Sequence, residues 1–101
     1  MLRITAITNA KIVLKLEGRL VGPWVDELMR AVLRIRRRRK PLVIDVSGLT
    51  FADDNGEEAL RWLHRKRARF IGKDPFSQYL FERLKIPLCS REAELDESGS
   101  Q

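Results

Sequence analysis

The sequence has little of the chemistry on which small metal proteins and disulfide-bonded proteins depend. It holds one cysteine, Cys89, and one histidine, His64, so it offers neither an internal disulfide nor a cysteine–histidine zinc site. We therefore expect a protein of a reducing compartment, the cytoplasm. No apolar run approaches the roughly 18 residues of a membrane span, and the N-terminus lacks the apolar segment of a signal peptide. We expect neither a membrane span nor export by a signal peptide.

The composition is that of one globular domain. The chain has 101 residues, of which 44% are hydrophobic, enough to build a single core. The net charge is +6, but the stretch 91–101 is acidic, so the positive excess lies in the rest of the chain. We predict a domain over residues 1–88, followed by an acidic, flexible C-terminal tail over residues 89–101.

The hydrophobic pattern alternates between strand and helix periods, which predicts an α/β domain. Residues 3–7 and 11–16 form an opening hairpin, and residues 23–37 have the apolar spacing of a helix. The apolar run 41–46 is typical of a buried strand, and the polar stretch 47–56 is predicted to be a turn-rich connection. A short helix around Leu60, a short strand over 68–72, a helix begun by Asp74-Pro75 and an optional edge strand at 86–89 complete the chain.

The connection into the second helix is unusually acidic and contains four carboxylates around an Asn-Gly pair: Asp53, Asp54, Glu57 and Glu58. Asp54 is predicted to be the N-cap, with Glu57 as the partner of a capping box. Mg²⁺ accepts carboxylates at such spacing, but Glu57 has Arg61 one turn later, and nothing here resembles a calcium-binding loop. No nucleophile and base are paired in the sequence. We predict no metal, no cofactor and no catalytic residue.

Three stretches of the sequence, in their order and spacing, resemble a known family: LEGRL at 16–20, LVIDVSGLTFADDNG at 42–56 and KDPFSQYLFERLKI at 73–86. In this order and spacing the chain resembles the STAS domain, which is shared by bacterial anti-sigma factor antagonists and by the cytoplasmic parts of sulfate-transporter-like anion transporters. The middle stretch is the most diagnostic, since STAS domains place Ser-Gly and a loop after a buried strand that ends in Asp. The resemblance implies a STAS-like mixed sheet with about three helices packed on it, in the order β-β-α-β-α-β-α(-β).

The resemblance also assigns a role to the acidic connection. In kinase-regulated antagonists this loop resembles Asp-Ser-Ser/Thr-Gly, and its first serine is the phosphoacceptor. Here Asp53 matches the aspartate, while Asp54 occupies the phosphoacceptor-equivalent position and cannot be phosphorylated as a serine. The resemblance implies a non-enzymatic module for signalling and transcription regulation in the bacterial cytoplasm, with an anti-sigma factor or serine kinase as its protein partner. The predicted partner-binding loop comprises Asp53, Asp54, Asn55, Gly56, Glu57 and Glu58.

Two interpretations of Asp54 remain. An aspartate could imitate the phosphorylated, non-binding state, although it carries one charge where phosphoserine carries about −1.5 to −2. Alternatively, the partner has adapted to a carboxylate, and binding is constitutive. We favour constitutive binding.

The basic residues gather in two runs, one at the end of each of the first two helices: Arg34, Arg36, Arg37, Arg38, Arg39 and Lys40, then Arg61, Arg65, Lys66, Arg67 and Arg69. Right-handed crossovers would place both runs at the end of the domain opposite the acidic loop. Helix C-termini account for part of this charge. The rest suggests an alternative function, a basic-pole module for nucleic acid or a large acidic assembly. We favour a solvated surface or a patch for an acidic partner over nucleic acid, because no aromatics are interleaved for base stacking. A purely structural homo-oligomer is a further alternative.

Overall fold

The protein is described by a computed structural model that covers residues 1–37 and 39–90. Arg38 and the stretch 91–101, which includes most of the predicted acidic tail, lie outside the described residues. The elements follow the predicted order: β1 (Leu2–Thr8), β2 (Ile12–Leu20), α1 (Pro23–Arg36), β3 (Leu42–Ala52), α2 (Asp54–Arg65), β4 (Arg69–Ile71) and α3 (Pro75–Leu84). The predicted α/β class is confirmed. None of the helices in the described part has the length and apolar character required to cross a bilayer.

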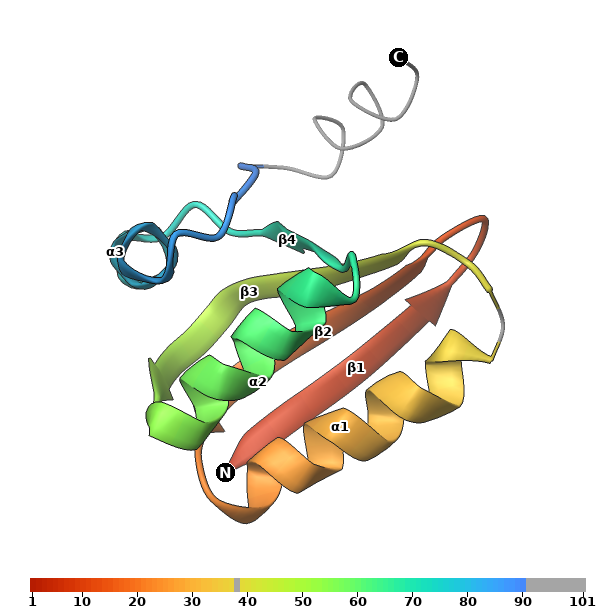
Figure 1. Cartoon of the computed structure of the whole chain (residues 1–101), viewed down its shortest axis with the longest axis horizontal. Helices are drawn as coiled ribbons and strands as arrows, with labels where there is room; N and C mark the ends of the chain where they lie inside the picture. Colours follow the sequence, from red (N-terminus) through yellow and green to blue (C-terminus); the bar gives the residue numbers. More distant parts are fainter. Residues whose placement is uncertain (38, 91–101) are drawn as a thin grey trace.

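The four strands form one mixed sheet in the order β1-β2-β3-β4. β1 pairs antiparallel with β2, whereas the β2–β3 and β3–β4 pairs are parallel. Because the two parallel crossovers proceed across the sheet in the same direction with the same hand, they place α1 and α2 on one face. Figure 1 shows α2 in front of the sheet and α1 alongside β1, with the two helices running in the same direction.

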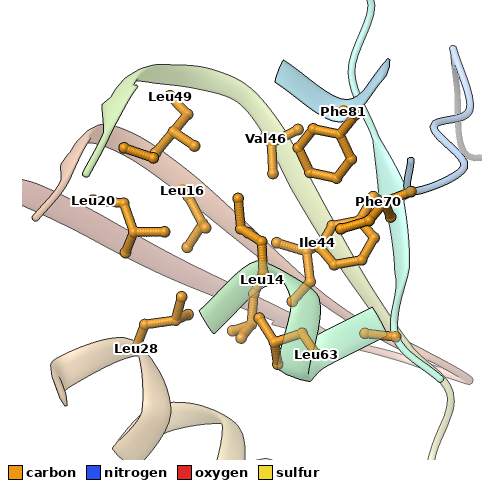
Figure 2. Close-up of a cluster of buried hydrophobic side chains, with 14 of the residues drawn as sticks. Leu14, Leu16, Leu20, Leu28, Ile44, Val46, Leu49, Leu63, Phe70 and Phe81 are labelled. Atoms are coloured by element: carbon orange, nitrogen blue, oxygen red, sulfur yellow. The ribbon is translucent and has the colours of Figure 1, made fainter. Parts of the chain in front are cut away.

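The core lies between this sheet face and the helices. Alternate residues of β2 are fully buried, which matches the predicted period of two. They meet Leu28 of α1, Leu63 of α2 and Ile44 of β3 (Figure 2). Phe70 of β4 and Phe81 of α3 pack against each other with ring centroids 5.0 Å apart, so α3 joins the same core.

The middle strands are longer than the sequence predicted. β3 continues to Ala52, so the interpretation of residues 47–52 as a turn-rich connection is wrong. β2 likewise continues to Leu20 instead of ending at residue 16. The two extensions pair with each other, ending with Leu20 beside Ala52. This longer pairing carries the starts of α1 and α2 to the same end of the sheet.

The extended pairing is irregular, which explains why its sequence looks like a turn. Lys15 and Glu17 of β2 lie beside Asp45 and Gly48 of β3, so β3 contributes one extra residue in this interval. Gly48 fits because a Cβ there would lie 2.8 Å from the Glu17 Cγ and 2.9 Å from the Leu16 carbonyl oxygen. The Ser-Gly pair that is typical of turns therefore lies in a bulged strand.

The C-terminal part follows its local signals closely. Asp74 caps α3 by accepting a hydrogen bond from the Ser77 N–H at 3.1 Å, as the Asp-Pro opening predicted. The helix ends at Leu84, and Lys85 is its C-cap. The optional edge strand at 86–89 is reduced to a single parallel bridge between Ile71 and Cys89.

Candidate functional site

The start of α2 is held by Asp53, the last residue before the helix. One carboxylate oxygen, Oδ1, accepts a hydrogen bond from the Gly56 N–H at 2.8 Å, which makes Asp53 the N-cap. The other, Oδ2, accepts from the Gly22 N–H at 3.2 Å, and Gly22 is the N-cap of α1. A single carboxylate therefore joins the N-termini of both helices.

The predicted cap at Asp54 is wrong by one residue. Asp54 is the first residue of α2, and the third residue after the true cap is Gly56 rather than Glu57, so no capping box forms. The reason is tertiary: the Asp53 N–H donates to the Leu20 carbonyl oxygen at 3.2 Å, which fixes Asp53 at the point where β3 ends.

Gly56 permits the close approach of α2 to the end of β2. A Cβ at this position would lie 2.3 Å from the Leu20 carbonyl oxygen, closer than non-bonded atoms approach. The first turn of α2 therefore rests directly on the backbone of β2. Gly56 is buried and contributes to the shape of the predicted partner-binding loop.

Glu57 faces α3. Its side chain is only 12% exposed and forms an ion pair with Arg83, which is half exposed. The hydrogen bond with Glu57 holds the pKa of the Arg83 guanidinium above its ordinary value. The predicted pairing of Glu57 with Arg61 is therefore wrong, and Arg61 instead lies 3.9 Å from Glu58. Glu57 connects two helices.

Asp54 and Asn55 are the remaining residues of the loop, and both are exposed. In the described part of the chain, neither side chain has a hydrogen bond or ion pair. Asn55 and Glu58 line the rim of a groove of about 640 Å³ between α1 and α2. The loop thus supplies polar groups beside a hollow large enough to accept a side chain of another molecule.

The groove residues on α1 and on the later turns of α2 were missed by the sequence analysis. The apolar part of the groove comes from Val25 and Met29 of α1 and from Trp62 of α2. Val25 and Met29 are one helical turn apart, and Trp62 is partly buried against the core. Only the packing of the two helices shows that they also form one surface.

The basic residues divide among several surfaces. Those at the C-terminal ends of α1 and α2 and in the segments that follow line one hollow of about 430 Å³: Arg36, Arg39, Lys40, Lys66 and Arg67. Arg65 lines the groove beside the acidic loop instead, and Arg69 lines a separate hollow with His64 and Arg67. Arg34 and Arg37 are exposed on and just after α1. The helix ends that carry the basic hollow lie opposite the helix starts that carry the acidic loop (Figure 1).

No protein-family model matches this sequence, and no curated protein matches it either. Solved structures do match the fold over nearly the whole chain. The anti-sigma factor antagonist SpoIIAA in its unphosphorylated form has a TM-score of 0.61 at 17% identity, covering 99% of this chain and 97% of SpoIIAA. The phosphorylated form of SpoIIAA, described as a Bacillus cell fate determinant, has a TM-score of 0.59 at 16% identity, covering 97% of this chain and 99% of that one.

A third solved structure broadens the comparison. It is an uncharacterised protein from Shewanella loihica PV-4, of the DUF3478 family, with a SpoIIAA-like fold. It has a TM-score of 0.59 at 13% identity, covering 94% of this chain and 91% of its own. The chain therefore has the SpoIIAA-like fold of STAS domains, and the resemblance read from the three sequence stretches is confirmed at the level of fold.

Proposed function

We propose that this chain is a non-enzymatic regulatory module of the bacterial cytoplasm, an anti-sigma factor antagonist homologue that binds a protein partner through the start of α2. The fold supports this proposal, because SpoIIAA, which shares it, is an anti-sigma factor antagonist. Because one fold can serve many functions, the residues of the site decide what this domain does.

The proposal is carried by one observation: some residues of the acidic loop make contacts inside the domain, whereas others leave their side chains without such contacts. Asp53, Gly56 and Glu57 are used inside the domain, as helix cap, backbone contact and ion-pair partner. Asp54 and Asn55 are held in place by them, yet their side chains form no hydrogen bond or ion pair within the described residues. Polar groups on a rigid support that lack internal partners are suited to contact another molecule.

The adjoining groove supplies what such an interface needs in addition. Interfaces are typically anchored by apolar or aromatic side chains at the centre and framed by polar groups. Here Met29 and Trp62 form the apolar part, while Asn55 and Glu58 form the rim. We propose that the partner inserts an apolar side chain between α1 and α2 and places a donor group opposite Asp54.

The charge at Asp54 favours constitutive binding over imitation of a phosphorylated state. One carboxylate supplies less charge and fewer acceptor oxygens than phosphoserine, so it is a weak imitation. The two interpretations predict opposite results for Asp54→Ser. Under constitutive binding the serine variant binds the partner more weakly, whereas under imitation it binds more tightly.

The test is a pull-down from the cytosol of the source organism with the immobilised wild-type chain and with Asp54→Ala, Asp54→Ser and Glu82→Ala. Glu82 is an exposed carboxylate that lines a different hollow, so its removal changes the net charge by the same amount and serves as control. We expect a partner that wild type and Glu82→Ala retain and that Asp54→Ala binds about fivefold or more weakly in titration. Equal retention by all variants would refute the assignment of the loop.

Incubation of the captured complexes with ATP, followed by intact-mass measurement, tests whether the partner is a serine kinase. A kinase of this type adds phosphate to Asp54→Ser and leaves the wild type unmodified. Phosphate on both chains would place the modified residue elsewhere in the sequence.

A further inference from the structure

The hollow at the opposite end of the domain is lined by cations around an apolar floor. Its floor consists of Val32, Leu42, Leu63 and Ala68, and its rim carries the five basic side chains named above. No carboxylate is among the described residues that line it. The rim residues come from three separate pieces of chain: α1, the segment before β3, and the end of α2. The sheet topology is what brings them together.

Most of this charge has no counter-charge within the protein. Arg36, Arg39 and Arg67 form no ion pair with any described carboxylate. Lys40 donates a hydrogen bond to the Asn9 carbonyl oxygen at 2.7 Å, and the Lys66 ammonium lies 5.6 Å from the centre of the Trp62 ring. The C-termini of α1 and α2 each contribute about half a negative elementary charge, so together they offset roughly one of the five cations.

The backbone at two of these arginines is held in a conformation that favours glycine. Arg39 has φ 56° and Arg67 has φ 70°, both in the left-handed region. Arg67 is the residue after the C-cap of α2: its N–H donates to the His64 carbonyl oxygen at 2.9 Å, and the Ala68 N–H donates to that of Leu63 at 3.0 Å. This is the Schellman arrangement, in which the Arg67 position is most often glycine.

Arginine occupies both positions although glycine is favoured there. A non-glycine residue in this region is less stable than glycine would be, and such strain is concentrated at functional sites. Lys85 also has a positive φ, at the end of α3, but it does not line this hollow. The basic hollow therefore combines unpaired charge, concave shape and a backbone conformation that is unfavourable for its own residues.

We propose that the basic hollow binds a compact ligand that carries several phosphate groups. The volume of about 430 Å³ suits a small ligand. A terminal phosphate brings about −1.5 to −2 charge and three acceptor oxygens. Neighbouring phosphates of one small molecule therefore concentrate more charge in the hollow than carboxylate side chains, which bring one charge each and are spaced along a peptide backbone. Planar guanidinium groups bind phosphate oxygens in pairs, which explains the predominance of arginine on the rim.

Shape distinguishes this ligand from a nucleic-acid strand. An extended strand needs a groove of positive charge along its backbone, with aromatic side chains for stacking. Here the cations surround one hollow whose floor is aliphatic. Clustered phosphates could belong to a free small molecule or to a lipid headgroup, and the experiment separates these two sources.

The test uses inorganic triphosphate as probe, with calorimetric titration and amide chemical-shift mapping on the full chain. We expect binding at one site, with the largest shifts at residues that line the basic hollow. In Arg39→Gly/Arg67→Gly we expect the affinity to fall by about fivefold or more. The melting temperature of this variant should not fall, because glycine is favoured at both positions. Loss of binding together with retained stability separates the ligand site from the fold.

The matched control is Arg30→Gln/Arg61→Gln, which removes the same charge from exposed helix positions outside the hollow. Its affinity for triphosphate should stay within about twofold of wild type, since both arginines are exposed to screening by salt, do not line the hollow and already face a carboxylate. An equal loss in both double variants would show a diffuse charge effect and overturn the proposal. So would an unchanged affinity in Arg39→Gly/Arg67→Gly.

Further probes decide the ligand class. The first two probes are a single-stranded RNA oligonucleotide and a poly-glutamate peptide. If either binds more tightly than triphosphate, with amide chemical-shift changes that extend beyond the hollow, the proposal is overturned in favour of a macromolecular partner. Phosphatidylcholine vesicles with and without a phosphorylated phosphoinositide distinguish the sources. Binding to the phosphoinositide vesicles that Arg39→Gly/Arg67→Gly abolishes supports a lipid headgroup, and triphosphate binding without vesicle binding supports a free ligand.

Discussion

Asp53 and Asp54 are adjacent carboxylates with opposite roles, and substituting each by alanine separates stability from recognition. Asp53 caps α2 and also accepts the Gly22 N–H at the start of α1. Asp54 is exposed and has no hydrogen bond or ion pair to the described residues. We expect Asp53→Ala to destabilise the domain and Asp54→Ala to leave its stability nearly unchanged.

The magnitudes follow from the contacts. Loss of an N-cap costs about 1 kcal/mol, and loss of the second hydrogen bond, which the charged carboxylate accepts from the Gly22 N–H, costs about 1 kcal/mol more. A total of about 2 kcal/mol corresponds to a fall in melting temperature of about 8–16 °C for a domain of this size. For Asp54→Ala, the lost interaction with the helix dipole, about 0.5 kcal/mol, is offset by the higher helix propensity of alanine.

The assay is urea unfolding followed by circular dichroism, with thermal melts of the same three proteins. If Asp54→Ala were as destabilised as Asp53→Ala, the cap would be shared between the two carboxylates and our assignment of Asp54 as an unused surface group would be refuted. If neither variant were destabilised, the hydrogen bonds of Asp53 would contribute nothing measurable, and the description of how the loop is held would fail.

Two further substitutions test the packing that positions the site. Gly56→Ala places a Cβ against the Leu20 carbonyl oxygen. We expect this substitution to lower the free energy of unfolding by about 2–3 kcal/mol, although alanine has the higher helix propensity. Unaltered stability in urea would contradict the close contact of α2 with β2. Phe81→Ala removes half of an aromatic pair from the core, with an expected loss of about 3 kcal/mol or more in the same assay. A loss under about 1 kcal/mol would mean that α3 is not an integral part of the core.

Local signals predicted those elements whose stability comes from their own residues. Asp74-Pro75 marked the start of α3 correctly, because an N-cap and a proline at the first helical position act through the nearest turn alone. The alternation in β2 predicted its buried face for the same reason, since side-chain direction in a strand follows the local backbone.

Predictions were wrong where a distant part of the chain decides the conformation. Gly48 has the sequence signature of a turn but lies in β3, because pairing with β2 satisfies the backbone there and leaves no room for a larger residue. The cap fell on Asp53 rather than Asp54 because the Leu20 carbonyl oxygen fixes the Asp53 N–H. Both positions depend on β2, about thirty residues earlier in the chain.

By itself the sequence determined the α/β class, the order of the elements and the opposition of an acidic loop to a basic pole, because these follow from hydrophobic periods and from the hand of parallel crossovers. The tertiary structure decided which charged residues are used. Packing of α1 beside α2 places Trp62 next to Asn55 in one groove and gathers Arg39 and Arg67 around one hollow. Contacts between segments distant in sequence leave no local pattern, so only the folded chain shows which side chains share a surface.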